Sequence, residues 1–131
     1  MRYLLDTMIW LWSVADTDRI GKAGLAILRN GGEEIYLSAA SSWEIALKAK
    51  LGKFELPEPP GPYVRTRIAT QAIRSLPITL DHTLCVYDLP LHHHDPFDRL
   101  LIAQAIAEEM TILTADRVFG KYPVKILRCG K

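Results

Sequence analysis

Cysteine is scarce in this chain: only Cys85 and Cys129 occur among 131 residues, and they show no paired spacing. Small secreted domains that depend on disulfides carry several cysteines at close intervals, so that class of scaffold is excluded. Two widely separated cysteines fit a reducing compartment, and we expect the protein to be cytoplasmic.

Long hydrophobic runs are also missing. The apolar segment 3–15 is too short to span a bilayer, is interrupted by Asp6, and follows a single basic residue, Arg2, which is unlike a signal peptide. We expect this segment to be buried in a globular core, and we expect no membrane association.

The sequence signatures of several common enzyme classes are absent as well. The chain has no G-x-S-x-G turn that would carry a serine nucleophile, and it has no glycine-rich loop that would cradle a nucleotide phosphate. It also has no internal repeat. Any chemistry must therefore come from side chains that the fold brings together.

The composition is that of a globular protein, with 49% hydrophobic and 24% charged residues. A chain of this length builds one core, so we predict a single domain over residues 1–131. Patterning predicts strands at 3–5, 35–37, 76–78, 111–114 and 124–127, and helices at 20–28, 39–51, 63–73, 81–87 and 96–110, with a further short helix after Thr7. Strands that alternate with helices predict an α/β fold, with a mostly parallel sheet of about five strands covered on both faces.

Caps and breakers mark the ends of these elements. Ser38 and Asp95 are predicted N-caps, and Thr7 is expected to cap the first short helix. Gly52 is placed to end the helix 39–51. The stretch 56–62 contains four prolines, which remove backbone donors, so it is predicted to be a loop.

Two acidic residues directly follow predicted strands. Asp6 comes after the first strand and Asp116 after the strand 111–114. The carboxyl ends of parallel strands meet at one edge of a sheet, where ligands commonly bind, so both carboxylates should lie at that edge. Each residue taken singly could instead serve a turn or a helix start, as aspartate often does.

Glu44 and Asp98 are predicted to point inward from helices. Glu44 lies on the same helical face as Ala40, Trp43, Leu47 and Leu51, whereas pairing with Lys48 on the surface is the alternative. Asp98 shares a face with Leu101, Ile102, Ala105 and Ile106, although it could simply support the capped helix start formed by Asp95 and Pro96. A buried carboxylate requires a cation or solvent beside it.

Four carboxylates in one pocket would repel one another, and a divalent cation removes that conflict. Oxygen ligands favour Mg²⁺ or Mn²⁺, which can polarise a phosphoryl oxygen and activate water for phosphodiester hydrolysis. A zinc site at His92, His93 and His94 is disfavoured, because adjacent rings cannot converge on one ion, and we expect an exposed loop there.

The net charge of only +1 would argue against a polyanionic substrate. If four of the 15 acidic residues are gathered in one pocket, however, basic residues dominate the rest of the surface. Basic residues between positions 99 and 131 are then candidates for a rim around that pocket, namely Arg99, Arg117, Lys121, Lys125, Arg128 and Lys131.

Four segments together resemble the PIN domain, specifically the VapC-type toxins of prokaryotic toxin-antitoxin pairs: LLDTMIWLW, SAASSWEIALKAKLGKFEL, HHHDPFDRLLIAQAIAEEM and ILTADRVFGKYPV. The resemblance covers nearly the whole chain and implies a PIN-like three-layer fold and an endoribonuclease that uses one or two Mg²⁺ or Mn²⁺ ions. It places the four family acids, catalytic and metal-binding, on Asp6, Glu44, Asp98 and Asp116, and it gives Thr114 and Asp95 supporting roles.

The resemblance also implies a homodimer, an RNA substrate, and a VapB-like antitoxin that blocks the pocket and binds operator DNA. The segment of Trp10 and Trp12 and the helix near Ile45 are candidate contact surfaces, although burial in the core is the simpler use of both. A PIN-domain nuclease acting on DNA or in RNA processing remains an alternative, as does a binding module without catalysis. A receiver domain is disfavoured, because Asp6 lacks an adjacent acid and Lys125 lies within the last predicted strand.

Overall fold

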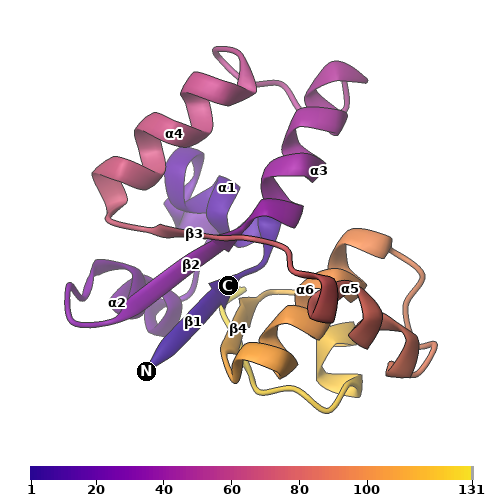
Figure 1. Ribbon diagram of the computed structural model, residues 1–131. Coiled ribbons are helices and arrows are strands. Elements are labelled where there is room, and N and C mark those ends of the chain that lie inside the picture. Colours follow the sequence, from indigo (N-terminus) through magenta and orange to yellow (C-terminus); the bar gives the residue numbers. More distant parts are fainter. Residues whose placement is uncertain (131) are drawn as a thin grey trace.

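Five parallel strands form the central sheet of the computed structural model, which describes residues 1–130 (Figure 1). The strands are β1 Arg2–Leu5, β2 Glu34–Ser38, β3 Arg74–Leu76, β4 Thr111–Thr114 and β5 Ile126–Arg128. Their order is β3-β2-β1-β4-β5, so the first strand of the chain is the central one. The predicted parallel α/β architecture is therefore confirmed.

Helices connect the strands and cover the sheet (Figure 1). They are α1 Thr7–Ala15, α2 Lys22–Arg29, α3 Ala39–Lys50, α4 Pro60–Gln71, α5 Leu80–Cys85 and α6 Pro96–Glu108, with short 3-10 turns η1 Thr17–Arg19, η2 Val86–Asp88 and η3 Arg117–Lys121. Within residues 1–130, no helix combines the length and apolarity needed to cross a bilayer.

Successive side chains along the strands point to opposite faces of the sheet and pack into two separate hydrophobic cores, one on each face. Tyr3 and Leu5 of β1 pack with side chains of α1, α2 and α4, whereas Leu4 between them packs with α6 and η3. In β4, Leu113 joins the first core and Ile112 the second. Both faces are thus buried under helices, which gives three layers, as expected for a parallel sheet.

Several local predictions were wrong, for identifiable reasons. α4 begins at Pro60, inside the predicted proline loop, because the first turn of a helix has no use for the backbone donors that proline lacks. Thr7 lies within α1 rather than capping it, and its hydroxyl donates to Ser41 Oγ at 2.8 Å. β3 ends before Pro77 instead of running through it.

The apolar face of α3 differs from the predicted one. Glu44 is buried as expected, but it is buried beside Ala40, Ser41 and Ile45. Trp43, Leu47 and Leu51, which were predicted to share its face, are 56%, 41% and 60% exposed. We refer to these three side chains as the outer apolar row of α3.

A closed polar network links the sheet to α5 and α6. Ser38 Oγ caps α3 and donates to Gln104 Oε1 at 2.5 Å, and Gln104 Nε2 lies 3.3 Å from His82 Nδ1. The Thr79 amide also donates to Nδ1, so Nε2 carries the hydrogen that is donated to Glu108 Oε2 at 3.1 Å. Ser38, His82 and Gln104 are almost completely buried, and every polar group is paired, so the network stabilises the contact between these elements.

Candidate active site

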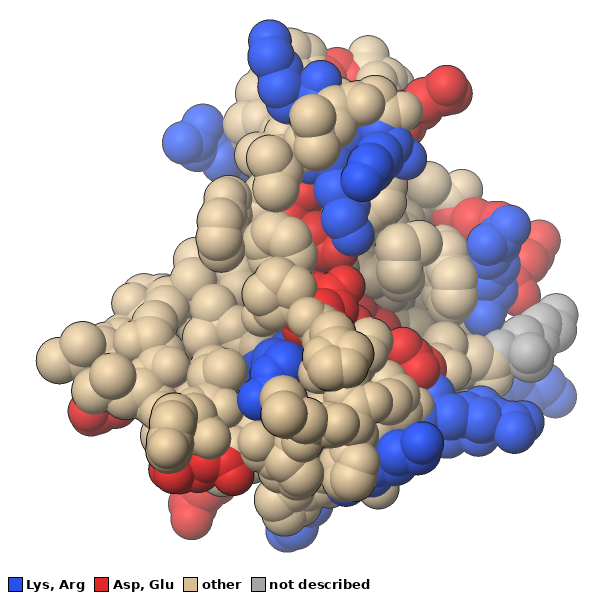
Figure 2. Space-filling view, turned by 90° about the vertical axis from the view of Figure 1, so that its right-hand side faces the viewer, with Lys and Arg blue, Asp and Glu red and all other residues tan. Residues whose placement is uncertain are grey.

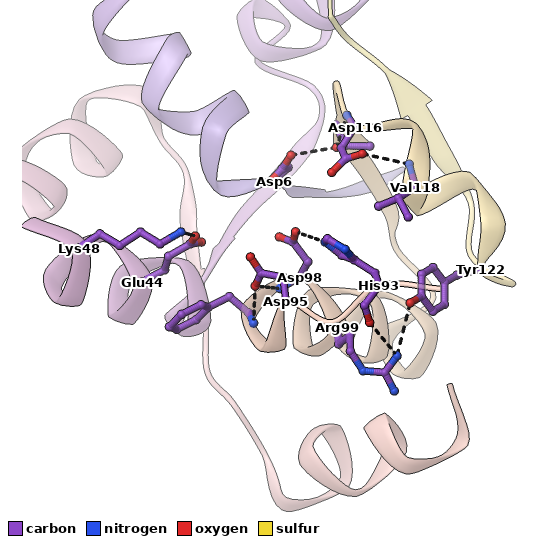
Figure 3. Close-up of polar contacts among 12 residues, drawn as sticks. Asp6, Glu44, Lys48, His93, Asp95, Asp98, Arg99, Asp116, Val118 and Tyr122 are labelled. Carbon is purple, nitrogen blue, oxygen red and sulfur yellow. Dashed lines mark hydrogen bonds and ion pairs between the residues drawn. The ribbon is translucent and has the colours of Figure 1, made fainter. Parts of the chain in front are cut away.

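A pocket of about 380 Å³ lies at the carboxyl ends of β1 and β4, and acidic side chains from four separate segments face into it (Figure 3). Its lining includes Asp6, Glu44, Asp95, Asp98 and Asp116, together with Lys48. Red carboxylates run along this hollow in the space-filling view (Figure 2). The structure therefore brings together the acids that the sequence singled out.

Asp6 and Asp116 are joined through Thr114, the last residue of β4. Thr114 Oγ1 donates to Asp6 Oδ2 at 2.9 Å and accepts the Asp116 amide at 3.0 Å. The Asp6 amide itself donates to the Leu113 carbonyl at 2.9 Å, which fixes the end of β1 beside the end of β4. One buried hydroxyl thus joins the Asp6 carboxylate to the backbone of Asp116.

Asp95 and Asp98 stand at the start of α6. Asp95 Oδ1 accepts the amides of Phe97 and Asp98, so Asp95 is the N-cap, as predicted. Asp98 therefore does not cap the helix, and its Oδ2 lies 2.7 Å from His93 Nε2, within hydrogen-bond distance. Asp116 also caps η3, because its Oδ1 accepts a hydrogen bond from the Val118 amide at the start of that turn.

Glu44 reaches the pocket from α3 and combines the two roles that its sequence left open. It is only 5% exposed, and its Oε2 lies 2.5 Å from Lys48 Nζ. Its other oxygen, Oε1, is buried with no hydrogen-bond partner among residues 1–130. A buried, unpaired carboxylate oxygen costs free energy unless a cation or water meets it.

Burial and mutual repulsion make the metal-free pocket electrostatically unfavourable. Burial, followed by the charge of Asp98, raises the pKa of Asp6 to about 7, although the bond from Thr114 acts in the opposite direction. Burial also raises the pKa of Asp98 to about 6; the hydrogen bond from His93 lowers it and the charge of Asp95 raises it. For Lys48, burial lowers the pKa, but the hydrogen bond and charge of Glu44 outweigh it and leave the pKa raised.

The donor set fits a divalent cation. Carboxylate oxygens are the ligands that Mg²⁺ and Mn²⁺ prefer, and a cation would favour the ionised forms of Asp6 and Asp98. The unpaired Glu44 Oε1 points to the same need for positive charge. Donor atoms of His93, Asp98 and Asp116 also lie within 4.8 Å of one another.

His93 is the site residue that sequence reasoning missed. The triplet at 92–94 was expected to be an exposed loop, and His92 and His94 are exposed, but His93 turns toward Asp98 and is partly buried. Three consecutive histidines look alike in the sequence. The only available signal was that the triplet lies within a few residues of Asp98, with a proline between them.

The predicted basic rim is only partly correct. Arg99 is buried, and its guanidinium donates to the carbonyls of Val86 and Pro90 and to the Tyr122 hydroxyl, so it serves the structure. Lys131 lies outside the described residues. Arg19 and Arg128, however, line a second cleft of about 520 Å³ that shares Trp12 and Ala115 with the acidic pocket. Lysine and arginine side chains gather on both sides of the acidic hollow in Figure 2.

The three-layer fold with carboxylates gathered at the carboxyl ends of its strands defines an α/β protein with a candidate metal site, and comparison with known proteins identifies the family. The model of the PIN domain matches residues 3–125. The chain therefore belongs to the PIN domain family, whose members are metal-dependent nucleases.

A curated relative supports the same assignment. Ribonuclease VapC16 of Mycobacterium tuberculosis is 42% identical over 57 residues, which covers 44% of this chain and 39% of that protein. The match thus spans well under half of that relative's length. The chain is related to VapC toxins at the level of a distant homologue.

Solved structures share the fold over nearly the whole chain. VapBC2 from Rickettsia felis, bound to a DNA fragment from its promoter, has a TM-score of 0.72 at 16% identity and covers 98% of both chains. DNA-bound VapBC from Salmonella typhimurium has a TM-score of 0.73 at 15% identity and covers 98% of both chains. FitAB bound to the IR36 DNA fragment has a TM-score of 0.69 at 20% identity, covering 96% of this chain and 94% of that chain. This chain therefore shares its fold with one chain of each of these structures.

Proposed function

We propose that this chain is a metal-dependent endoribonuclease and the toxin of a VapBC-type toxin-antitoxin pair. The observation that carries the proposal is the convergence of Asp6, Glu44, Asp98 and Asp116 on one pocket. The sequence relation to ribonuclease VapC16 favours RNA over DNA as the substrate.

Asp6, Asp98 and Asp116 would hold one or two Mg²⁺ or Mn²⁺ ions in this mechanism, with Thr114 and Asp95 positioning those carboxylates. The bound ion supplies charge that stabilises the phosphoryl oxygens in the transition state and lowers the pKa of attacking water. The chain's own residues fix the geometry, because Thr114 holds Asp6 and the end of β4 together.

Glu44 is the residue best placed to orient the attacking water. Lys48 Nζ pairs with Oε2, which fixes the rotation of the carboxylate. Oε1 is left as a free acceptor on a residue that lines the pocket, and a water that donated to it would be held beside the metal-binding acids as the nucleophile. The Lys48 ammonium lies over the rings of Phe54 and Phe97, 5.4 Å and 5.9 Å from the ring centres, which helps to hold it beside Glu44.

Single-stranded RNA fits the surroundings of the pocket. An open backbone can reach a hollow of this size, and unstacked bases bind aromatic and arginine side chains. Trp12 lies between the acidic pocket and the cleft of Arg19 and Arg128, with the Arg19 guanidinium 5.6 Å from the Trp12 ring centre. A base on Trp12 would place its flanking phosphate near these arginines.

The outer apolar row of α3 is a candidate surface for binding another protein chain. Trp43, Leu47 and Leu51 are exposed side by side along one helix, and contiguous apolar surface of this kind commonly marks an interface. We propose that this surface serves a homodimer or a VapB-like antitoxin. Operator DNA would be bound only through the antitoxin, as the DNA-bound VapBC structures suggest by analogy.

The proposal is tested by incubating the purified chain with single-stranded RNA and Mg²⁺ or Mn²⁺. Cleavage is expected with either ion, is expected to stop on chelation, and is expected to fall by about 10³-fold in Asp98→Asn. Asp81→Asn, an exposed acid on α5, is the matched control and should cleave as the unchanged chain does.

Circular dichroism of Asp98→Asn must match that of the unchanged chain, so that loss of cleavage is not loss of fold. Unimpaired cleavage by a folded Asp98→Asn would sink the assignment of the site. Cleavage of single-stranded DNA at a higher rate than RNA would favour the DNA nuclease instead.

A further inference from the structure

A histidine lies beside two of the carboxylates of the pocket. His93 Nε2 lies 2.7 Å from Asp98 Oδ2, and donor atoms of His93, Asp98 and Asp116 all lie within 4.8 Å of one another (Figure 3). Donors that share one ion with bonds of about 2.1 Å lie about 3–4 Å apart, so a small side-chain rotation would bring all three to the same ion.

The His93 ring is held in this place by the fold. Arg99, the residue after Asp98 on α6, is buried and donates to carbonyls of the segment before α6, including those of Pro90 and His93. The His93 ring also packs against Phe119, with ring centres 6.4 Å apart. The segment that carries His93 is thus anchored to the helix that carries Asp98, and the two side chains keep their relation.

The neighbouring histidines have no such relation to the pocket. His92 is exposed and stacks edge-on against Tyr122, with ring centres 5.3 Å apart, and His94 is exposed. Only one of these three chemically identical side chains is turned toward Asp98 and Asp116. This contrast supplies a matched control at the adjacent residue.

An independent observation calls for a ligand in the same pocket. Glu44 is 5% exposed, and its Oε1 has no partner among residues 1–130. Glu44 lines the pocket together with Asp98 and Asp116. A buried carboxylate oxygen without a partner needs a cation or a bound water beside it, and Asp98, which bonds to His93, lines that same pocket.

We propose that His93 Nε2 is a metal ligand, which with Asp98 and Asp116 makes a mixed nitrogen and oxygen site that selects Mn²⁺ or another first-row transition ion over Mg²⁺. The inference rests on the metal-dependent function proposed above and specifies the ion. Imidazole nitrogen suits transition ions, whereas Mg²⁺ is bound through carboxylates and water.

Ion binding would replace the hydrogen bond between His93 and Asp98. A ring that binds the ion through Nε2 carries its hydrogen on Nδ1, because the Nε2 lone pair is then used for the ion. The competing role is that of a positioning residue, in which His93 only orients Asp98 through Nε2–H. The two roles differ in whether the ring nitrogen bonds the ion.

Pulsed electron paramagnetic resonance of the Mn²⁺-loaded chain separates these roles. A ligand nitrogen gives a ¹⁴N coupling to Mn²⁺, which we expect in the unchanged chain and in His92→Ala but not in His93→Ala. Absence of that coupling in the Mn²⁺-loaded unchanged chain, or its survival in His93→Ala, would overturn the proposal.

Calorimetric titration gives the second readout. In His93→Ala, Mn²⁺ affinity should fall by about 10–100-fold and Mg²⁺ affinity by less than about 3-fold, so that the preference for Mn²⁺ is lost. An equal fall for both ions would mean that His93 only positions Asp98. Thermal denaturation of the variants without metal checks that both remain folded.

These measurements use no RNA, so they can fail independently of the nuclease proposal. A chain that cleaves RNA but lacks the nitrogen coupling keeps its proposed function and loses this inference. A chain with the coupling but without cleavage keeps the inference and loses the function.

Discussion

Two buried polar groups contact the same helix, α6, and they differ in one respect. The network of Ser38, His82, Gln104 and Glu108 pairs each of its polar atoms with another. The pocket around Asp98 gathers carboxylates of one sign, raises the pKa of two of them, and leaves Glu44 Oε1 without a partner among residues 1–130. In the network every buried polar atom has a hydrogen-bond partner within the protein. In the pocket one buried oxygen has none in the part of the chain that the structure describes, and a ligand would have to supply it.

The contrast between the paired network and the acidic pocket distinguishes polar residues that stabilise the fold from polar residues that are suited to binding. A satisfied network strengthens the fold, because breaking it leaves buried groups unpaired. Repelling carboxylates weaken the fold of the metal-free chain and persist where binding requires them. Substitutions in the two groups should therefore change stability in opposite directions.

The largest effect is expected for Asp6→Asn. Removing a buried carboxylate should raise the free energy of unfolding of the metal-free chain by about 2–4 kcal/mol at pH 8, because Asn keeps an oxygen for Thr114 without the charge. Urea unfolding in the presence of a chelator measures this. Asp81→Asn should change stability by less than about 0.5 kcal/mol, and a destabilised Asp6→Asn would break the comparison.

A somewhat smaller effect is expected from pH. Because the pKa of Asp6 is about 7 in the folded chain and lower when unfolded, the folded chain binds the extra proton between about pH 4 and 7. Stability of the metal-free chain is therefore lost as pH rises through this window. The difference between the unchanged chain and Asp6→Asn, followed by urea unfolding at each pH, should grow toward pH 7 and then level off.

Mn²⁺ or Mg²⁺ should reduce that pH dependence, because an ion in the pocket stabilises the ionised carboxylate. If the difference between the two chains is the same at pH 4.5 and pH 8, the carboxylate of Asp6 is not the source of the instability.

The smallest effect is expected in the closed network. Gln104→Leu conserves volume but removes the partner of Ser38 and a contact of His82, so stability should fall by about 1–3 kcal/mol. This loss should be the same with and without metal, and the variant should cleave RNA normally when folded. A metal-dependent loss would mean that the two polar groups are coupled through α6.

Much of the fold could be predicted from the sequence, because strong local signals agreed with the final packing. Buried strands such as 3–5 and 111–114 and the caps at Ser38 and Asp95 were all identified. The start of α4 was missed because proline in a first helical turn resembles proline in a loop. The outer apolar row of α3 was assigned to the core because hydrophobic spacing alone does not say which apolar face is covered.

The candidate site could be predicted as a set of acids but not as a geometry. Parallel topology sends Asp6 and Asp116 to one edge, and this reasoning needed only the strand order. The roles of His93 and Arg99 depend on how the segment 86–93 folds back onto α6, which no periodic pattern records. Arg99 was predicted to lie in a solvent-exposed rim, yet it is buried among backbone carbonyls.

The bond between Thr114 and Asp6 joins residues 108 positions apart, near the two ends of the described chain. During synthesis, Asp6 emerges from the ribosome long before β4 exists, so β1, the central strand, cannot pair with β4 until much later. A nascent chain therefore cannot assemble its acidic pocket until β4 and Asp116 have been made. Any shorter nascent chain lacks part of the pocket, so the site appears only when strands far apart in the sequence have come together.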